Sequence, residues 1–187
     1  RNIKAMHIKE RVIQRCLCDY VLIPALKQSL VYDNGASLKG KGIHFAVLRL
    51  KNMLEKYIRK HGTKGYILIT DFSGYFDSIQ HLPIWFILMD KFKDPELRLF
   101  IWKFVKAFGN KSLGIGSQVS QILALVYPNR VDHRIKEYYR NGLSARYNDD
   151  CYVISDDKST LKRLLEDCSR LWSDLGIFLN TGKTRIE

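Results

Sequence analysis

The stretch LSARYNDDCYVIS at residues 143–155 sets two strand-forming runs on either side of Asn148, Asp149 and Asp150. Tyr, Val and Ile favour strands, and Asn and Asp favour tight turns, so the stretch predicts a β-hairpin with the acids at its tip. Two adjacent carboxylates repel each other unless a cation lies beside them. Because turns also accept Asp and Asn for purely structural reasons, the pair alone leaves both a plain turn and a cation site open.

A third acid follows an apolar run upstream. GYILIT at residues 65–70 predicts a buried strand, and Asp71 comes directly after it. If this strand neighbours the one at 151–155, Asp71 meets the hairpin tip. The three carboxylates would then bridge two Mg²⁺ ions about 4 Å apart, with Mn²⁺ able to substitute.

The rest of the chain alternates helical patterns with short loops and strands. Because strands and helices follow one another without a repeated βαβ unit, the pattern predicts an α+β fold with an antiparallel sheet packed on helices. The expected elements are a helix at 11–30 with a turn or kink at Pro24, a Gly/Lys loop at 33–42, a helix at 43–60 ending near Gly62, one or two helices at 82–108 broken near Asp94-Pro95, a loop at 112–116, a long helix at 117–140 bent at Pro128, a helix at 158–175, and short strands at 177–179 and from Lys183.

Charge is concentrated near the N-terminus. The chain of 187 residues has a formal net charge of +12, and residues 1–64 hold 14 Lys and Arg against 4 Asp and Glu. Such a surface suits a phosphate backbone, although a solvated face is the simpler alternative. Lys39 and Lys41 are candidate phosphate contacts. We expect a solvated face from the basic residues of the next helix, which are Arg49, Lys51, Lys56, Arg59 and Lys60.

Other classes of protein are disfavoured by composition. No apolar run reaches membrane-spanning length, and no secretory leader opens the chain, so we expect no membrane partner. The four cysteines form no C-x-x-C pair and the histidines are scattered, which argues against a zinc site. Free thiols in a reducing cytoplasm are the expectation. The first residue is not Met, which suggests a piece of a longer protein.

Five segments in order resemble the motifs of reverse transcriptases. DFSGYFDSI at 71–79 resembles motif A, SLGIGSQVSQILALVYPNRVDHRIKE at 112–137 motif B, RYNDDCYVIS at 146–155 motif C and LGIFLNTGKT at 175–184 motif D. The upstream stretch RNIKAMHIKERVIQRCLCDYVLIPAL resembles the fingers motifs. The resemblance implies an RNA-directed DNA polymerase with the fingers and palm of a right-hand fold.

The resemblance also implies a domain division. Residues 1–64 would be fingers and 65–187 palm, with some fingers elements interleaved around 82–112. The thumb of the family is absent from this chain, so we expect weak binding of template–primer and poor extension.

Site residues are carried over position by position. The resemblance assigns the metal ions to Asp71, Phe72, Asp149 and Asp150. It gives Lys183 the role of protonating or neutralising the departing pyrophosphate. Phe76 matches an aromatic gate that excludes the ribonucleotide 2′-hydroxyl, although a core Phe is the alternative. The backbone amides that would meet triphosphate oxygens are those of Phe72, Ser73, Gly74, Tyr75 and Phe76.

Three motif B residues and one terminal residue complete the set. Gly116 lets the nascent base pair approach, since it has no Cβ. Gln118 and Gln121 would touch the templating nucleotide, or would simply cap the helix. Arg1 would match a fingers arginine that grips the incoming triphosphate.

The motifs also suggest a subgroup. Ile115-Gly116 followed by Ser120-Gln121 resembles diversity-generating retroelement enzymes of bacteria, with group II intron enzymes, retrons and unclassified bacterial enzymes as close alternatives. The implied partners are an RNA template, a DNA or RNA primer, deoxynucleoside triphosphates, and an accessory protein or a homodimer. The first rival function is a non-catalytic nucleic-acid-binding scaffold, against which the presence of all three acids argues. The second is a DNA- or RNA-templated polymerase of another kind, such as a viral RNA polymerase, against which Phe76 argues.

Overall fold

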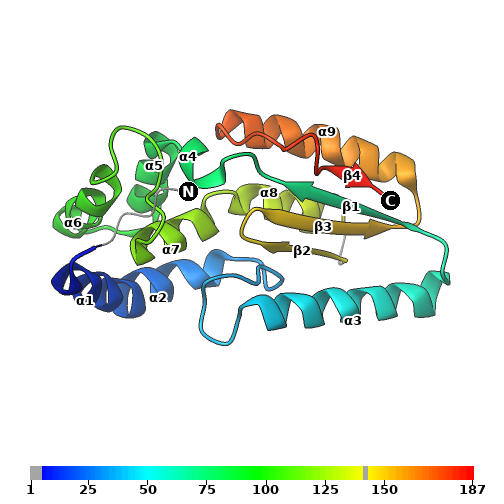
Figure 1. The fold of residues 1–187 in the computed structure, drawn as a ribbon, viewed down its shortest axis with the longest axis horizontal. Helices are drawn as coiled ribbons and strands as arrows, with labels where there is room; N and C mark the ends of the chain where they lie inside the picture. The colour runs from blue at the N-terminus through cyan, green and yellow to red at the C-terminus, as the bar shows by residue number, and fades with distance from the viewer. Residues whose placement is uncertain (1–5, 141–142) are drawn as a thin grey trace. The chain divides into compact units, whose positions relative to one another are not determined.

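The computed structural model describes residues 6–140 and 143–187 (Figure 1). The chain forms two compact units, one within Arg1–Leu30 and Gly74–Tyr127 and the other within Val31–Ser73 and Pro128–Glu187. Each unit is discontinuous, because the chain leaves the second unit after Ser73 and returns to it at Pro128. The division into fingers and palm follows motifs rather than these units, and it stays a prediction.

A four-stranded antiparallel sheet forms the centre of the second unit. The strands are β1 (Tyr66–Asp71), β2 (Ser144–Tyr147), β3 (Asp150–Ser155) and β4 (Arg185–Ile186). Their spatial order is β2-β3-β1-β4, with β1 antiparallel to both β3 and β4. The α+β fold with an antiparallel sheet is therefore confirmed.

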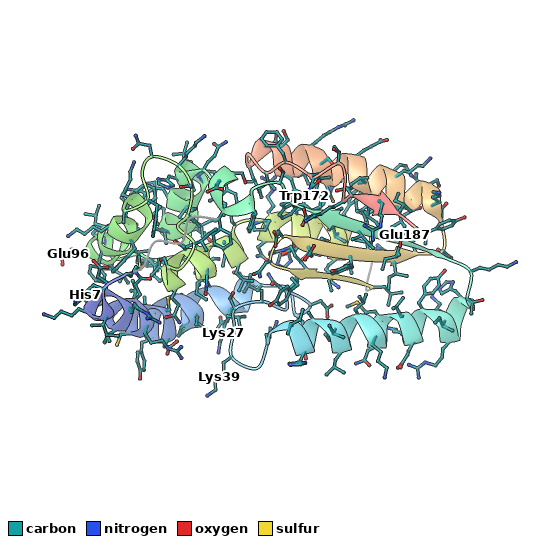
Figure 2. All side chains as sticks on the ribbon, in the orientation of Figure 1. His7, Lys27, Lys39, Glu96, Trp172 and Glu187 are labelled. Atoms are coloured by element: carbon teal, nitrogen blue, oxygen red, sulfur yellow. The ribbon has the colours of Figure 1, made fainter. Side chains whose placement is uncertain are left out.

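Two amphipathic helices cover this sheet, and Figure 1 shows them on opposite sides of it. Helix α9 (Lys158–Asp174) is capped by Asp157, whose carboxylate accepts hydrogen bonds from the amides of Ser159 and Thr160. The helix buries an apolar stripe against the sheet. Trp172 ends that stripe and is fully buried (Figure 2). Helix α3 (Ile43–His61) packs Met53 and Tyr57 against Ile154 of β3.

The first unit is helical. Its helices are α1 (Ile8–Leu17), a π-helical turn (Cys18–Leu22), α2 (Ile23–Leu26), a 3₁₀ turn (Lys27–Ser29), α4 (Tyr75–Ser78), α5 (His81–Lys91), α6 (Pro95–Lys106) and α7 (Gln118–Val126). The break between α5 and α6 lies where it was predicted, because Asp94 caps α6 and Pro95 occupies its first turn.

The predicted helix at 117–140 is interrupted rather than bent. Helix α7 ends at Val126, and α8 (Asn129–His133) starts after Pro128 and continues as a π-helical turn (Arg134–Tyr138). Proline has no backbone N–H and its ring crowds the preceding turn, which accounts for the break.

The predicted strand at 177–179 is wrong. Leu179 forms only an isolated bridge with Phe72, and the final strand begins at Arg185 rather than at Lys183. The reason is a turn at Asn180, whose carbonyl accepts the amides of both Lys183 and Thr184 at 3.1 and 2.9 Å. Because of this turn, the chain after Asn180 does not pair with β1 until Arg185.

Two further expectations concern thiols and membranes. The four cysteines, Cys16, Cys18, Cys151 and Cys168, are all free thiols. Within residues 6–140 and 143–187, no helix combines the length and the apolar character needed to cross a bilayer.

Candidate active site

Strand register brings two of the predicted acids together. Asp71 at the end of β1 lies directly opposite Asp150 at the start of β3. Residues opposite each other on neighbouring strands project from the same face of the sheet, with Cβ atoms about 5 Å apart. The proposed neighbourhood of the first palm strand and the hairpin is therefore present in the fold.

The hairpin turn places the third acid one residue away. Asn148 has a φ of +52°, in the left-handed region that a two-residue turn of this kind needs. The turn consists of Asn148 and Asp149, while Asp150 pairs with Tyr147 as the first residue of β3. The prediction that both acids lie at the tip is corrected: only Asp149 does. Asp149 is also tied to β1, because its carbonyl accepts the amide of Phe72 at 3.3 Å.

Lys183 reaches this cluster from the C-terminal segment. Its Nζ lies 3.3 Å from both carboxylate oxygens of Asp71. The Asn180 turn delivers the lysine, since the amide of Asn180 donates to the carbonyl of Asp71 at 2.8 Å. The Asp71 side chain is 12% exposed and that of Lys183 is 64% exposed. Asp71 is thus a fixed, buried anion, and Lys183 is its solvent-facing cation.

The surroundings of Asp150 disfavour its ionised form. Burial raises the pKa of Asp150 above its ordinary value, and the charges of Asp149 and Asp71 raise it further, while Lys183 opposes them. A carboxylate whose charged form is disfavoured by neighbouring carboxylates gains most from an added cation.

Asp150→Asn is expected to raise the free energy of unfolding of the metal-free chain at pH 7. The wild-type carboxylate is disfavoured in the folded state, and this penalty disappears as Asp150 takes up a proton. The gain should therefore shrink as the pH falls through the raised pKa toward the ordinary range of a carboxyl group. Urea unfolding in EDTA at pH 7 and pH 4 measures it, with Glu166→Gln on α9 as the control. A gain that is independent of pH would contradict this account.

The carboxylates of Asp71, Asp149 and Asp150 suit divalent cations, but they do not converge on a single metal position. Carboxylate oxygens are the ligands that Mg²⁺ and Mn²⁺ favour, and the Lys183 ammonium shows that Asp71 already attracts a positive charge. In the part of the chain that the structure describes, no three His, Cys, Asp or Glu side chains converge on a single metal position. A metal ion would have to take the place that Lys183 now holds beside Asp71.

The backbone amides of Phe72 and Ser73 are both hydrogen-bonded, and the Phe72 side chain is packed in the core. The Phe72 ring is buried, 5.1 Å from the Trp172 ring. The amide of Phe72 donates to Asp149 and that of Ser73 donates to Phe178 at 2.7 Å. These two amides are thus engaged within the unit, so the predicted triphosphate contacts of Phe72 and Ser73 would require these hydrogen bonds to break.

Residues of the first unit form a separate cluster. Gly74 adopts a left-handed φ of +55° ahead of α4, and Tyr75 is buried with its hydroxyl donating to the carbonyl of Ala124. Phe76 is half-buried, and its backbone carbonyl accepts a hydrogen bond from the amide of Leu113 at 2.8 Å. Arg1 lies outside the described residues.

The motif B residues line one pocket of the first unit. Gly116, Gln118 and Gln121 border a cavity of about 610 Å³ together with Arg11 and Arg15 of α1. This arrangement places two guanidinium groups and two side-chain amides around one cavity, and the Arg15 guanidinium is also paired with Asp19.

Gln14 was missed by sequence reasoning. It is 1% exposed, and its Oε1 accepts the Ser117 hydroxyl and the Gln118 amide, each at 3.0 Å. It therefore fixes the start of α7 beside this pocket. Its partners lie more than one hundred residues away, so no local pattern could reveal them.

Arg146 and Asp132 were also missed. Their side chains are 1% and 4% exposed, and two guanidinium nitrogens of Arg146, Nε and Nη2, hydrogen-bond the Asp132 carboxylate at 2.7–3.0 Å. The third nitrogen, Nη1, donates to the carbonyl of Asn148 at 2.8 Å. The buried pair thus holds the turn that presents Asp149. The available signal was an Arg at an inward-facing position of a strand, which requires a partner.

The chain is similar to a known protein family in sequence and to known structures in fold. The family model described as reverse transcriptase (RNA-dependent DNA polymerase) matches residues 2–187. Among solved structures, telomerase from Candida albicans in complex with a TWJ fragment of telomeric RNA aligns with a TM-score of 0.65 and 11% identity, over 96% of this chain and 33% of that one. Apo telomerase from Candida tropicalis truncated from its C-terminal domain aligns with a TM-score of 0.65 and 16% identity, over 96% and 40%. No curated protein sequence matches significantly.

These likenesses bear on the predicted subgroup. At such identities the telomerase structures show a shared fold alone, and neither they nor the family model confirms a bacterial diversity-generating or group II intron enzyme. The chain spans between a third and two-fifths of the length of those telomerases. Because the family model covers all but the first residue, the chain belongs to the reverse transcriptase family.

Proposed function

We propose that this chain carries the catalytic centre of an RNA-directed DNA polymerase that joins deoxynucleoside triphosphates to a primer 3′-hydroxyl. The observation that carries the proposal is the register that sets Asp71 opposite Asp150, with Asp149 in the adjoining turn and Lys183 on Asp71. Three carboxylates and one exposed cation at the end of the two central strands form a centre suited to phosphoryl chemistry.

The carboxylates are proposed to hold two Mg²⁺ ions, with Mn²⁺ as a substitute, together with a main-chain contribution at Phe72. When bound, such ions lower the pKa of the attacking hydroxyl and stabilise the triphosphate. Asp71 is buried and fixed through its carbonyl, so it orients the centre. Lys183 is exposed enough to move from Asp71 to the departing pyrophosphate and to give it a proton.

Selectivity is proposed to reside in the first unit. Phe76 would exclude a 2′-hydroxyl, and Gly74, Tyr75 and Phe76 would offer amides to the triphosphate. Gly116, Gln118 and Gln121 share their pocket with Arg11 and Arg15, which supports a role at the template strand. Arg1 is proposed as a further triphosphate contact.

RNA is the proposed template. The Candida albicans telomerase of similar fold was solved with a fragment of telomeric RNA. The basic N-terminal third of this chain suits the same polymer. A DNA or RNA primer, an accessory protein or second copy, and a reducing cytoplasmic setting complete the proposal.

Incorporation of a labelled deoxynucleotide on a primed RNA template tests the proposal. With Mg²⁺, the wild-type chain should label the primer, and Asp149→Ala should not. The expected loss is at least about a hundredfold, since the reaction depends on charge stabilisation at this centre. Equal signals from the two proteins would contradict the proposal and favour a non-catalytic nucleic-acid-binding scaffold. In such a scaffold Lys183, and not a metal ion, would neutralise Asp71.

A further inference from the structure

The second unit has a basic pocket outside the site described above. This cavity of about 460 Å³, here named the distal pocket, is lined by Lys56, Tyr57, Lys60, His61, Arg140, Leu143, Ile154, Ser155 and Asp156. Its floor is apolar, because Tyr57 and Ile154 belong to the buried cluster under α3. Its rim is cationic and comes from two separate parts of the chain, since Lys56 and Lys60 belong to α3 and Arg140 follows the π-helical turn.

The distal pocket lies at the other end of the sheet from the carboxylates. In the β1–β3 ladder, Tyr66 pairs with Ser155 beside the pocket, and Asp71 pairs with Asp150 at the opposite end. The usual rise per residue separates the two pairs by roughly 17 Å. Figure 1 shows the C-terminal end of α3 at the end of β1 where that strand begins. A ligand in the distal pocket therefore cannot be the nucleotide that reacts beside Asp71.

The charges of the pocket are unbalanced. Lys56, Lys60 and Arg140 are basic residues, and Asp156 is the one acid among the described lining residues. Asp156 is engaged with His61, whose Nδ1 lies 3.4 Å from its Oδ2. The neighbouring Asp157 is turned to the amides of Ser159 and Thr160 as the cap of α9. The surplus positive charge thus remains unneutralised by the residues that line the cavity.

Helix electrostatics explain only part of this surplus. Cations in the last turn of a helix are favoured by its dipole, which accounts for Lys60 and His61 at the end of α3. The effect fades within one turn, so it does not account for Lys56, and it does not apply to Arg140 on another element. Lys56 and Lys60 are also four residues apart, a spacing at which like charges destabilise a helix. An anion between them would remove this penalty.

We propose that the distal pocket binds the phosphodiester backbone of an RNA segment that does not enter the catalytic centre. Only the choice of RNA as the anion rests on the proposed function. The concave shape and the unbalanced charge suit a nucleotide unit whose phosphates meet Lys56, Lys60 and Arg140. In this proposal Lys56 and Lys60 contact a ligand, whereas the sequence predicted a solvated face for them.

Fluorescence anisotropy with a labelled 12-base-pair RNA duplex in EDTA tests the pocket. Lys56→Glu/Lys60→Glu should weaken binding about tenfold or more and reduce the slope of log K against log salt by about 2, one for each lost phosphate contact. Lys91→Glu/Lys103→Glu on α5 and α6 changes the net charge equally at exposed positions outside the pocket. This control should have a clearly smaller effect. Equal losses in the two variants would overturn the proposal.

Three further arms keep the result interpretable. Lys56→Gln/Lys60→Gln serves if charge reversal prevents folding, and it should weaken binding in the same direction. Asp149→Ala should bind the duplex like wild type, so failure of the catalytic proposal leaves this one intact. Displacement of the duplex by a small excess of inorganic phosphate would indicate a site for a free anion. If Lys56→Glu/Lys60→Glu weakened binding to anionic vesicles but not to the duplex, the pocket would be a membrane contact. Either outcome would overturn the proposal.

Discussion

Arg146→Met should lower the free energy of unfolding by about 3–5 kcal/mol, because it leaves the Asp132 carboxylate buried without its partner. Asp132 is 4% exposed, and Arg146 supplies bonds to both of its oxygens. The same change removes the donor to the Asn148 carbonyl. Urea unfolding followed by circular dichroism measures the loss. A change below about 1 kcal/mol, the size expected at an exposed pair, would contradict the buried pairing.

The double variant Arg146→Met/Asp132→Leu separates stability from positioning. Replacing a buried ion pair by apolar residues of similar size is often close to neutral, so most of the lost stability should return. Nucleotide incorporation should stay low, because the Asn148 turn still lacks its donor. Recovery of both properties together would show that the pair stabilises the fold without positioning Asp149.

Lys183→Met should reduce nucleotide incorporation about 10²- to 10³-fold, the range found when one stabilising donor is removed from an active site. The exposed ammonium lies beside Asp71 and is the charge proposed to meet the pyrophosphate. The same variant should bind Mn²⁺ more tightly than wild type, because no ammonium competes for Asp71. Primer extension and Mn²⁺ titration give the two readouts.

Lys162→Met on the exposed face of α9 is the matched control, and it should change neither readout. Lys183→Arg keeps the charge and should restore part of the activity. If Lys183→Met lowers Mn²⁺ affinity and activity together, then the lysine organises the centre and does not act on the leaving group.

Local patterns predicted the elements that carry the chemistry. The alternation around Asn148 and the apolar run before Asp71 define β1, β2 and β3 within one residue or two. The Asp149–Asp150 boundary was misplaced because Asn148 takes the left-handed conformation, which lets Asp150 join the strand. The pairing of the strands at 65–70 and 151–155 was only a condition of the predicted site, and the register of β1 with β3 fulfils it.

Long-range partners could not be read from the sequence. Lys41 looked like a phosphate contact in a flexible loop, yet its Nζ donates to the carbonyls of Tyr32 and Asn34 at 2.6 and 2.7 Å. Burial lowers the pKa of Lys41, although Asp33 opposes this effect. This prediction is therefore wrong for Lys41, while Lys39 remains exposed. A pattern of Gly and Lys carries no information about carbonyls that face inward.

The central claim is that Asp71, Asp149 and Asp150 share divalent cations, and Mn²⁺-induced broadening of backbone amide NMR signals tests it without turnover. In the wild-type chain, substoichiometric Mn²⁺ should first broaden the signals of Phe72, Asp149, Asp150 and Lys183. Asp71→Asn/Asp150→Asn should abolish that broadening. Unchanged broadening in the double variant, or broadening centred on Asp156 and Asp157 in the wild type, would contradict the account.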